Sequence, residues 1–428
     1  MDLGNNVASL RRLRGWTQEE LAERCGLSVR TIRNVELGSV DPRRSSVKLI
    51  LRALDAGEVT EDSRGVPAAP DRWRGLPPPR HPIVGMRAEL HELARTVLAS
   101  RLTAVLGPGG VGKTRIALGV AAEIASTFRH GVLVVELGDI PAEEPAAPAP
   151  TAVILERVTR LVGPESTWNE PGTTGGAPGA NADLLILLDN AEHLPSAVAA
   201  AGKELLNAYP RAHILITSRR PVTDRWGLSR EIRPLPVEPA HQEGGSLAPA
   251  VELVLRRASA GLPATVDLAR DLPHVVELCR RLAGVPRALE FAAERLRTIP
   301  IRSLLAAGPA LRMLRTSDHS LSPHQRSVAD SIRWSTDLLS DEHRLLLRHI
   351  AGLPATEFTP EQVLAAAGEA AGADLENVLC LFSDLVDHGL VTACRDHVYR
   401  YRLMPYVGQV VCADLDASVV AACRVPAA

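Results

Sequence analysis

The chain has 428 residues, a formal net charge of −2 and an aromatic content of only 3%. This length accommodates roughly two to four domains with separate cores, and the near-neutral charge confines any affinity for nucleic acid to a local basic patch. The sequence has no apolar run of membrane-spanning length, no signal-peptide pattern and no Cys-x-x-Cys pair, so we expect a cytoplasmic chain with reduced thiols and no membrane partner.

Residues 1–57 have the pattern of an all-α helix-turn-helix domain. Thr17 and Glu20 form a capping box that begins a first helix, and Gly26 permits the turn that ends it. Ser28 then caps a second helix, which in a helix-turn-helix enters the major groove of DNA. The sequence therefore predicts a DNA-reading domain. The alternative is a small helical protein-interaction module with a solvated arginine face.

Over its full length this segment resembles the Cro/repressor-type (XRE) helix-turn-helix domains. The resemblance rests on residues 16–22, 26–28 and 35–38. It implies that polar side chains on the two helices contact bases or phosphates, and that nearby arginines add phosphate affinity. The predicted contacts are Gln18, Ser28, Arg30, Thr31, Arg33, Asn34, Arg43 and Arg44. Because one copy reads only a short half-site, we expect dimers or larger assemblies on double-stranded DNA.

A proline-rich stretch over residues 58–82 predicts an extended, flexible linker. Over residues 83–233, short apolar runs alternate with helical stretches, which predicts an α/β domain with a parallel sheet covered by helices. The expected strands are residues 102–106, 132–137, 184–188 and 213–217. Beyond residue 234 the pattern predicts helices, including 250–260 and 272–296, and one short strand over 397–403.

The stretch from Gly107 to Thr114 fits the phosphate-binding loop pattern, a glycine, four residues and then Gly-Lys-Thr. Its glycines let backbone N–H groups turn inward around phosphate oxygens. Lys113 is expected to reach the outer phosphates, and the Thr114 hydroxyl to hold Mg²⁺. The predicted nucleotide contacts in the loop are Gly107, Gly109, Gly110, Val111, Gly112, Lys113 and Thr114. The sequence therefore predicts a site for ATP or ADP with Mg²⁺.

A second apolar run ends at Asp189, which we expect at the sheet edge beside the loop, holding Mg²⁺ together with Thr114. Asn190 follows where many ATPases carry a second acid, and an amide is a poor base, so we predict at most slow hydrolysis. Glu192 is a candidate base, or else a polar cap on the next helix. Arg219 ends the following strand and is a candidate for binding the terminal phosphate, or else a solvent-exposed arginine.

Together these segments resemble the STAND/NB-ARC NTPases, and specifically the bacterial regulators that join this module to a DNA-binding domain. The resemblance rests on residues 83–85, 114–115, 187–194, 217–219, 284–290 and 332–339. It implies a P-loop NTPase domain over 83–233, a helical domain over 234–310 and a winged-helix domain over 311–428. It also implies that Val84, Arg115 and Pro286 contact the nucleotide.

The resemblance further implies a switch, in which ADP holds a closed form and exchange for ATP permits self-association. The chain departs from the family pattern at Met86, at Arg287 and at residues 404–406. Three functions stay open at this point. The first is a nucleotide-switched transcriptional regulator, the second is an ADP-locked repressor or scaffold without turnover, and the third is a DNA-stimulated P-loop ATPase. The sequence does not identify an inducing protein or small molecule.

Overall fold

The structure is a computed structural model of the chain. It describes residues 7, 11, 16–25, 27–36, 50, 72–79, 81–141, 149–163, 182–222, 227–238, 247–259, 268, 271–306, 313–316, 323–355, 357–371, 375–394, 399–404 and 406–413. The chain divides into two compact units, one formed by Met1–Gly65 with Leu235–Thr316 and the other by Val66–Pro234 with Ser317–Ala428.

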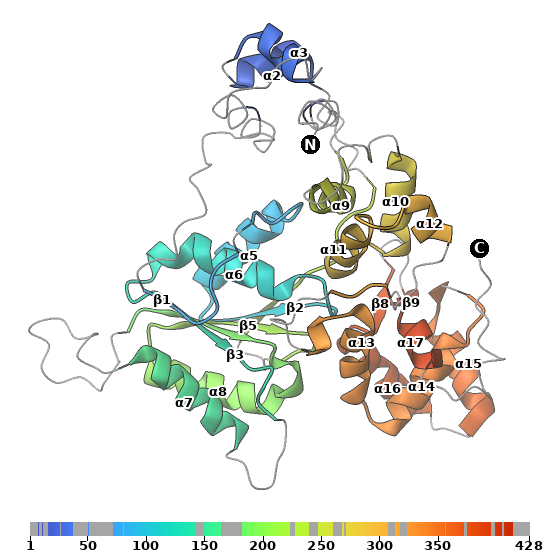
Figure 1. Ribbon diagram of the computed structural model, residues 1–428. Coiled ribbons are helices and arrows are strands. Elements are labelled where there is room, and N and C mark those ends of the chain that lie inside the picture. The colour runs from blue at the N-terminus through green and yellow to red at the C-terminus, as the bar shows by residue number, and fades with distance from the viewer. Residues whose placement is uncertain are drawn as a thin grey trace, which may run out of the picture. The chain divides into compact units, whose positions relative to one another are not determined.

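The second unit is built on a six-stranded parallel sheet with strand order β1-β3-β4-β5-β2-β6 (Figure 1). The strands are β1 (Trp73–Arg74), β2 (Leu102–Leu106), β3 (Val132–Glu136), β4 (Leu185–Asp189), β5 (His213–Ser218) and β6 (Leu228–Glu231). The four strands expected from the sequence are confirmed as β2 to β5. They read as continuous apolar runs because helices cover both faces of the sheet.

Two helices cover each face of this sheet. Helices α5 (Arg87–Ala99) and α6 (Lys113–Ile124) lie on one face, and α7 (Pro150–Val162) and α8 (Pro195–Ala208) lie on the other (Figure 1). All five residues of β4 are buried, and two of them, Ile186 and Leu188, pack with α7 and α8 in one apolar core. The register places Asp189 directly beside Glu136 of β3, so the polar ends of adjacent strands meet at one edge of the sheet.

Strand β1 comes from the stretch expected to be a flexible linker. It pairs in parallel with β3, and Arg74 donates from Nη1 to the carbonyl oxygen of Val162 at 2.6 Å. Gly75 follows at a φ of +94°, and a Cβ built there would lie 2.0 Å from the carbonyl oxygen of Val134. A two-residue strand held by long-range pairing leaves no periodic signal in the sequence, which explains the difference.

The same unit contains a C-terminal domain of helices and a small sheet. Its helices are a 3₁₀ turn (Pro323–Gln325), α13 (Val328–Asp337), α14 (Asp341–Ala351), α15 (Pro360–Ala371), α16 (Leu375–Asp387) and α17 (Val407–Ala413). Its antiparallel strands, in the order β7-β9-β8, are β7 (Glu357–Phe358), β9 (Tyr401–Leu403) and β8 (Val391–Ala393). Helix α13 begins at a clear cap, because Ser327 Oγ accepts from the N–H of Asp330 at 2.9 Å.

The first unit contains four helices in the described part of 235–316: α9 (Pro249–Ser259), α10 (Leu272–Arg281), α11 (Pro286–Arg295) and α12 (Ile301–Ala306). The single helix expected over 272–296 is wrong, because α10 and α11 are separate. Proline cannot continue a helix but suits its first turn, so Pro286 begins α11. Among the described helices of the whole chain, none is both long and apolar enough to cross a membrane.

The described helix-turn-helix residues form α2 (Gln18–Cys25) and α3 (Val29–Glu36) around a small apolar core. The predicted capping box is confirmed. Thr17 Oγ1 accepts from the N–H of Glu20 at 3.1 Å, and Glu20 Oε2 accepts from the N–H of Thr17 at 2.6 Å. Ser28 Oγ accepts from the N–H of Thr31 at 3.2 Å at the start of α3. Two consecutive short helices joined by a turn are the arrangement expected of a helix-turn-helix motif.

The pairing of β1 predicts the effect of one substitution. Gly75→Ala places a methyl group against the carbonyl oxygen of Val134 at a left-handed φ, so it should lower the free energy of unfolding of this unit by about 2 kcal/mol. Urea denaturation followed by circular dichroism measures the change. Gly202→Ala, in α8 with nothing within 4 Å of the added Cβ, is the control and should leave the midpoint equal or higher. Equal midpoints for both variants would contradict the pairing.

Candidate nucleotide-binding site

The phosphate loop connects β2 to α6, the strand-loop-helix order that the sequence predicts. Gly107, Gly110 and Gly112 have φ values of +150°, +77° and +100°, which only glycine adopts without strain. At Gly107 a Cβ would also lie 2.5 Å from the carbonyl oxygen of Ile232. These three glycines are therefore required by the path of the backbone, which begins α6 directly at Lys113.

Lys113 is buried at the centre of this loop. Its Nζ donates to the carbonyl oxygens of Gly107 at 2.8 Å and of Pro108 at 3.1 Å. Burial of the ammonium lowers the pKa of Lys113 from 10.5 to about 8, and the nearby Glu192 carboxylate partly opposes that shift. A bound phosphate would supply the counter-charge that two carbonyl groups only partly replace, so the loop suits an anionic ligand.

Asp189 at the end of β4 is almost fully buried, with 1% exposure. Its Oδ1 accepts from Thr114 Oγ1 at 2.8 Å and also from the hydroxyl of Thr217. Burial raises the pKa of Asp189 from 3.8 to about 6, although the two hydroxyl groups act in the opposite direction. Thr114 and Asp189 offer adjacent oxygen ligands, which fits Mg²⁺ held by a hydroxyl, a carboxylate and several waters.

Thr217 is a site residue that the sequence reasoning did not assign. It is the second-last residue of β5, the strand next to β4, and its hydroxyl also accepts from the N–H of Asn190 at 3.0 Å. Asn190 has a φ of +62°, and asparagine adopts this left-handed conformation more readily than most residues. The backbone thus favours an amide at position 190, where many ATPases carry a second acid.

Glu192 and Arg219 form a buried ion pair beside the loop. Arg219 Nε donates to Glu192 Oε1 at 3.0 Å, and the side chains are only 9% and 2% exposed respectively. A solvent-exposed Arg219 is therefore wrong, and burial lowers the pKa of this guanidinium. Glu192 Oε2 has no hydrogen-bond partner among the described residues, although it is buried. A buried carboxylate oxygen without a partner fits a place for water or a ligand.

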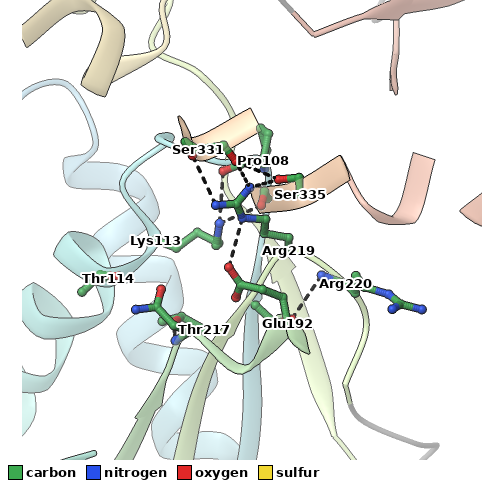
Figure 2. A network of polar contacts seen from close by, with 12 residues as sticks. Pro108, Lys113, Thr114, Glu192, Thr217, Arg219, Arg220, Ser331 and Ser335 are labelled. Atoms are coloured by element: carbon green, nitrogen blue, oxygen red, sulfur yellow. Dashed lines mark hydrogen bonds and ion pairs between the residues drawn. The ribbon is translucent and has the colours of Figure 1, made fainter. Parts of the chain in front are cut away.

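Arg219 also joins the sheet to α13 of the C-terminal domain (Figure 2). Its Nη1 donates to the carbonyl oxygen of Ser331 at 3.1 Å and to the hydroxyl of Ser335, and its Nη2 donates to Ser331 Oγ at 3.3 Å. The guanidinium carbon lies 4.8 Å from the centre of a Trp334 ring. No role was predicted for these serines, although their i, i+4 spacing places them on one face of a helix.

Three further residues, Val84, Arg115 and Pro286, are predicted to contact the nucleotide, and none of them belongs to the phosphate loop itself. Val84 is half-buried just before α5. Arg115, on α6, donates from Nη2 to the carbonyl oxygens of His81 at 3.3 Å and Pro82 at 3.4 Å. Pro286 begins α11 in the other unit, and its contact with the nucleotide stays a prediction.

On the helix-turn-helix, Arg30 and Arg33 are exposed on α3, and Thr31 and Asn34 are half-buried. Gln18 is held within the domain, since its Nε2 donates to Glu36 Oε2 at 2.7 Å. Ser28 Oγ lies 2.8 Å from Thr31 Oγ1. Arg43 and Arg44 lie outside the described residues. The exposed arginines of α3 are thus the predicted DNA contacts that are best placed to reach a ligand.

Residues 7–59 match the family model described as "Helix-turn-helix". The N-terminal region is a helix-turn-helix domain. The chain is 36% identical over 322 residues to the "Putative HTH-type transcriptional regulator Mb0914c" of Mycobacterium bovis, an alignment that covers 73% of this chain and 34% of that relative. It is 31% identical over 278 residues to the "Uncharacterized protein Rv0894" of Mycobacterium tuberculosis, covering 63% and 64%. The chain thus spans about a third of the length of the first relative.

Among solved structures, the chain is similar to the Walker-type ATPase PABY2304 of Pyrococcus abyssi. The TM-score is 0.52 at 16% identity, and the match covers 78% of this chain and 98% of the other. At this identity the likeness shows the fold alone. The helix-turn-helix domain is therefore followed by a parallel-sheet α/β domain with a P-loop ATPase-like fold.

The buried carboxyl group predicts a pH dependence. Because burial raises the pKa of Asp189 to about 6, the folded chain without nucleotide keeps a proton there that the unfolded chain releases near pH 4. The protonated Asp189 carboxyl therefore stabilises the folded state fully below about pH 4, and this stabilisation is lost as the pH rises through about 6. Asp189→Asn should remove this loss, which amounts to about 3 kcal/mol.

Urea unfolding of wild type and variant at several pH values between about 4 and 7 measures the difference. Asp139→Asn is the control. Arg157 lowers the pKa of the Asp139 carboxyl, so the contribution of Asp139 to stability is complete above about pH 4 and is lost only at more acid pH. The profile of Asp139→Asn should therefore run parallel to that of wild type over the measured range. Parallel pH profiles for wild type and Asp189→Asn would contradict the assignment.

Proposed function

We propose that this chain is a cytoplasmic, DNA-binding transcriptional regulator whose affinity for DNA is set by the adenine nucleotide, ADP or ATP, bound with Mg²⁺ at the phosphate loop. The observation that carries the proposal is the hydrogen bond from Thr114 to the buried carboxylate of Asp189 beside that loop, on a chain that also has a helix-turn-helix domain. The name of the Mycobacterium bovis relative, an HTH-type regulator, supports the same function.

Nucleotide control would act through self-association. One helix-turn-helix copy reads a short half-site, and several copies held together bind DNA much more tightly than one. In this proposal ADP keeps the chain in a closed form, and ATP permits the assembly that brings several helix-turn-helix domains onto DNA. The C-terminal domain, as a winged helix, closes over the nucleotide in the ADP form.

Hydrolysis in this proposal is slow and serves to reset the switch. Asn190 cannot act as a base, and Glu192 is the acid left beside the loop. One oxygen of Glu192 is held by Arg219, while the other has no partner among the described residues. Glu192 thus lies where a general base would act, but its ion pair with Arg219 makes it a weaker base. This argues against a fast DNA-stimulated ATPase as the primary function.

A permanently ADP-bound repressor is the second candidate. The engagement of Arg219 by α13 favours it, because this arginine would have to leave its present partners to bind a terminal phosphate. Incubation of the ADP-bound chain with ATP in solution separates the two candidates. A switch releases its ADP and takes up ATP, whereas a permanently ADP-bound repressor does not.

Loss of the loop lysine tests the nucleotide site. Lys113→Ala should weaken binding of MgADP and of MgATPγS by roughly 100-fold, because charge-assisted contacts to phosphate are lost. Isothermal titration calorimetry on the full chain measures both affinities. Lys203→Ala, which removes an exposed lysine on α8, is the control and should bind like wild type. A Lys113→Ala variant with wild-type affinities would contradict the site.

Loss of an exposed arginine on α3 tests the DNA interface. Arg33→Ala should weaken binding to a DNA fragment selected by the wild-type chain, and should lower the slope of log K against log salt by about 1. Fluorescence anisotropy at several salt concentrations measures both. Arg95→Ala, an equal loss of charge on α5, should change neither quantity. Equal salt slopes for wild type and Arg33→Ala would show that Arg33 makes no phosphate contact.

A further inference from the structure

Arg219 lies directly against the phosphate loop. A Cβ built on Gly109 would be 2.9 Å from Arg219 Nη1 and 3.1 Å from Ser331 Oγ. Gly109 is the third residue of the loop whose amides are expected to cradle phosphates. Ser331 belongs to the C-terminal domain, and a second residue of that domain also lies close to the loop. A Cβ built on Gly389 would be 3.1 Å from Cα of Pro108. The C-terminal domain thus reaches the loop at two points.

The serines of α13 use most of the donors of Arg219. Nη1 and Nη2 donate to Ser331 and Ser335, while Nε donates to Glu192 (Figure 2). Ser335 Oγ also lies 3.1 Å from the carbonyl oxygen of Ser331, which it can use as an acceptor within α13. The two serines are neutral ligands for a buried cation, and a phosphate oxygen is a much stronger acceptor for a guanidinium.

Aromatic side chains hold α13 against the loop that follows β4. The Trp334 ring stacks on His324 with centres 4.7 Å apart, and it meets His193 edge-on at 5.7 Å. His193 belongs to the same 3₁₀ turn as Glu192. If the serines released Arg219, the packing of α13 against the 3₁₀ turn beside Asp189 would therefore weaken.

A diphosphate and a triphosphate differ in the negative charge that they bring to the site. Lys113 and Arg219 are balanced by Asp189 and Glu192, so these four groups sum to zero when all are ionised. The loop amides, Lys113 and Mg²⁺ can neutralise the charge of a diphosphate. A third phosphate adds negative charge beside Gly109, where Arg219 is the nearest cation among the described residues.

We propose that Ser331 and Ser335 set the nucleotide preference of the site: by binding Arg219 they favour a nucleoside diphosphate, and the terminal phosphate of a triphosphate takes Arg219 from them and releases α13. This inference rests on the proposed nucleotide function. It assigns the discrimination to two hydroxyl groups of the C-terminal domain.

Affinity ratios in the full chain test the inference. The double variant Ser331→Ala with Ser335→Ala should bind MgATPγS about tenfold more tightly relative to MgADP than wild type does, because two hydrogen bonds that hold Arg219 are absent. Isothermal titration calorimetry measures both affinities. Thr336→Ala is the control on the same helix, since its hydroxyl donates to the carbonyl oxygen of Arg333 at 2.9 Å, and its ratio should equal that of wild type.

Hydrogen exchange supplies a second test that needs no variant. In wild-type chain, the amides of α13 should exchange faster with MgATPγS bound than with MgADP bound, because α13 loses its hold on Arg219. Equal exchange in both nucleotides, or an unchanged affinity ratio in the double variant, would overturn the inference while leaving the nucleotide site intact. A wild-type chain that binds neither nucleotide would overturn the proposed function and this inference together.

Discussion

The buried carboxylate of Asp189, held by the hydroxyls of Thr114 and Thr217, is the interaction on which the site depends. It lies where β4, β5 and the phosphate loop meet, and burial makes its charge unfavourable unless a cation is near. The parallel sheet brings the three groups together because it ends its strands at one edge. Arg219, two residues beyond Thr217, then reaches α13, so the same edge joins the sheet to the C-terminal domain.

Features set by local chemistry were predictable from the sequence. The loop glycines, the capping box at Thr17 and the four central strands each depend on neighbouring residues, and each is found as expected. The position of Asp189 followed from an apolar run that ends in an acid after a phosphate loop. Local patterns fail where two segments must meet: β1 exists only through pairing with β3, and the helix expected over 272–296 is divided before Pro286.

The partners of Arg219 could not be read from the sequence for the same reason. Ser331 and Ser335 are 112 and 116 residues away along the chain, and no spacing rule links them to the strand that ends near Arg219. The segment 332–339, which contains Ser335 but not Ser331, was singled out from the sequence, but the group that these serines bind was not. The arrangement places a neutral pair of hydroxyls, an acid and an arginine at one end of a phosphate loop, which is a suitable design for sensing an added charge.

In the proposed function, nucleotide bound at this loop controls DNA binding by changing the assembly of the chain. DNA footprinting combined with light scattering, on the full chain with MgADP and with MgATPγS, tests it most directly. We expect a larger particle and a longer protected region with MgATPγS. Equal particle mass and equal protection in both nucleotides, with both shown to be bound, would contradict it.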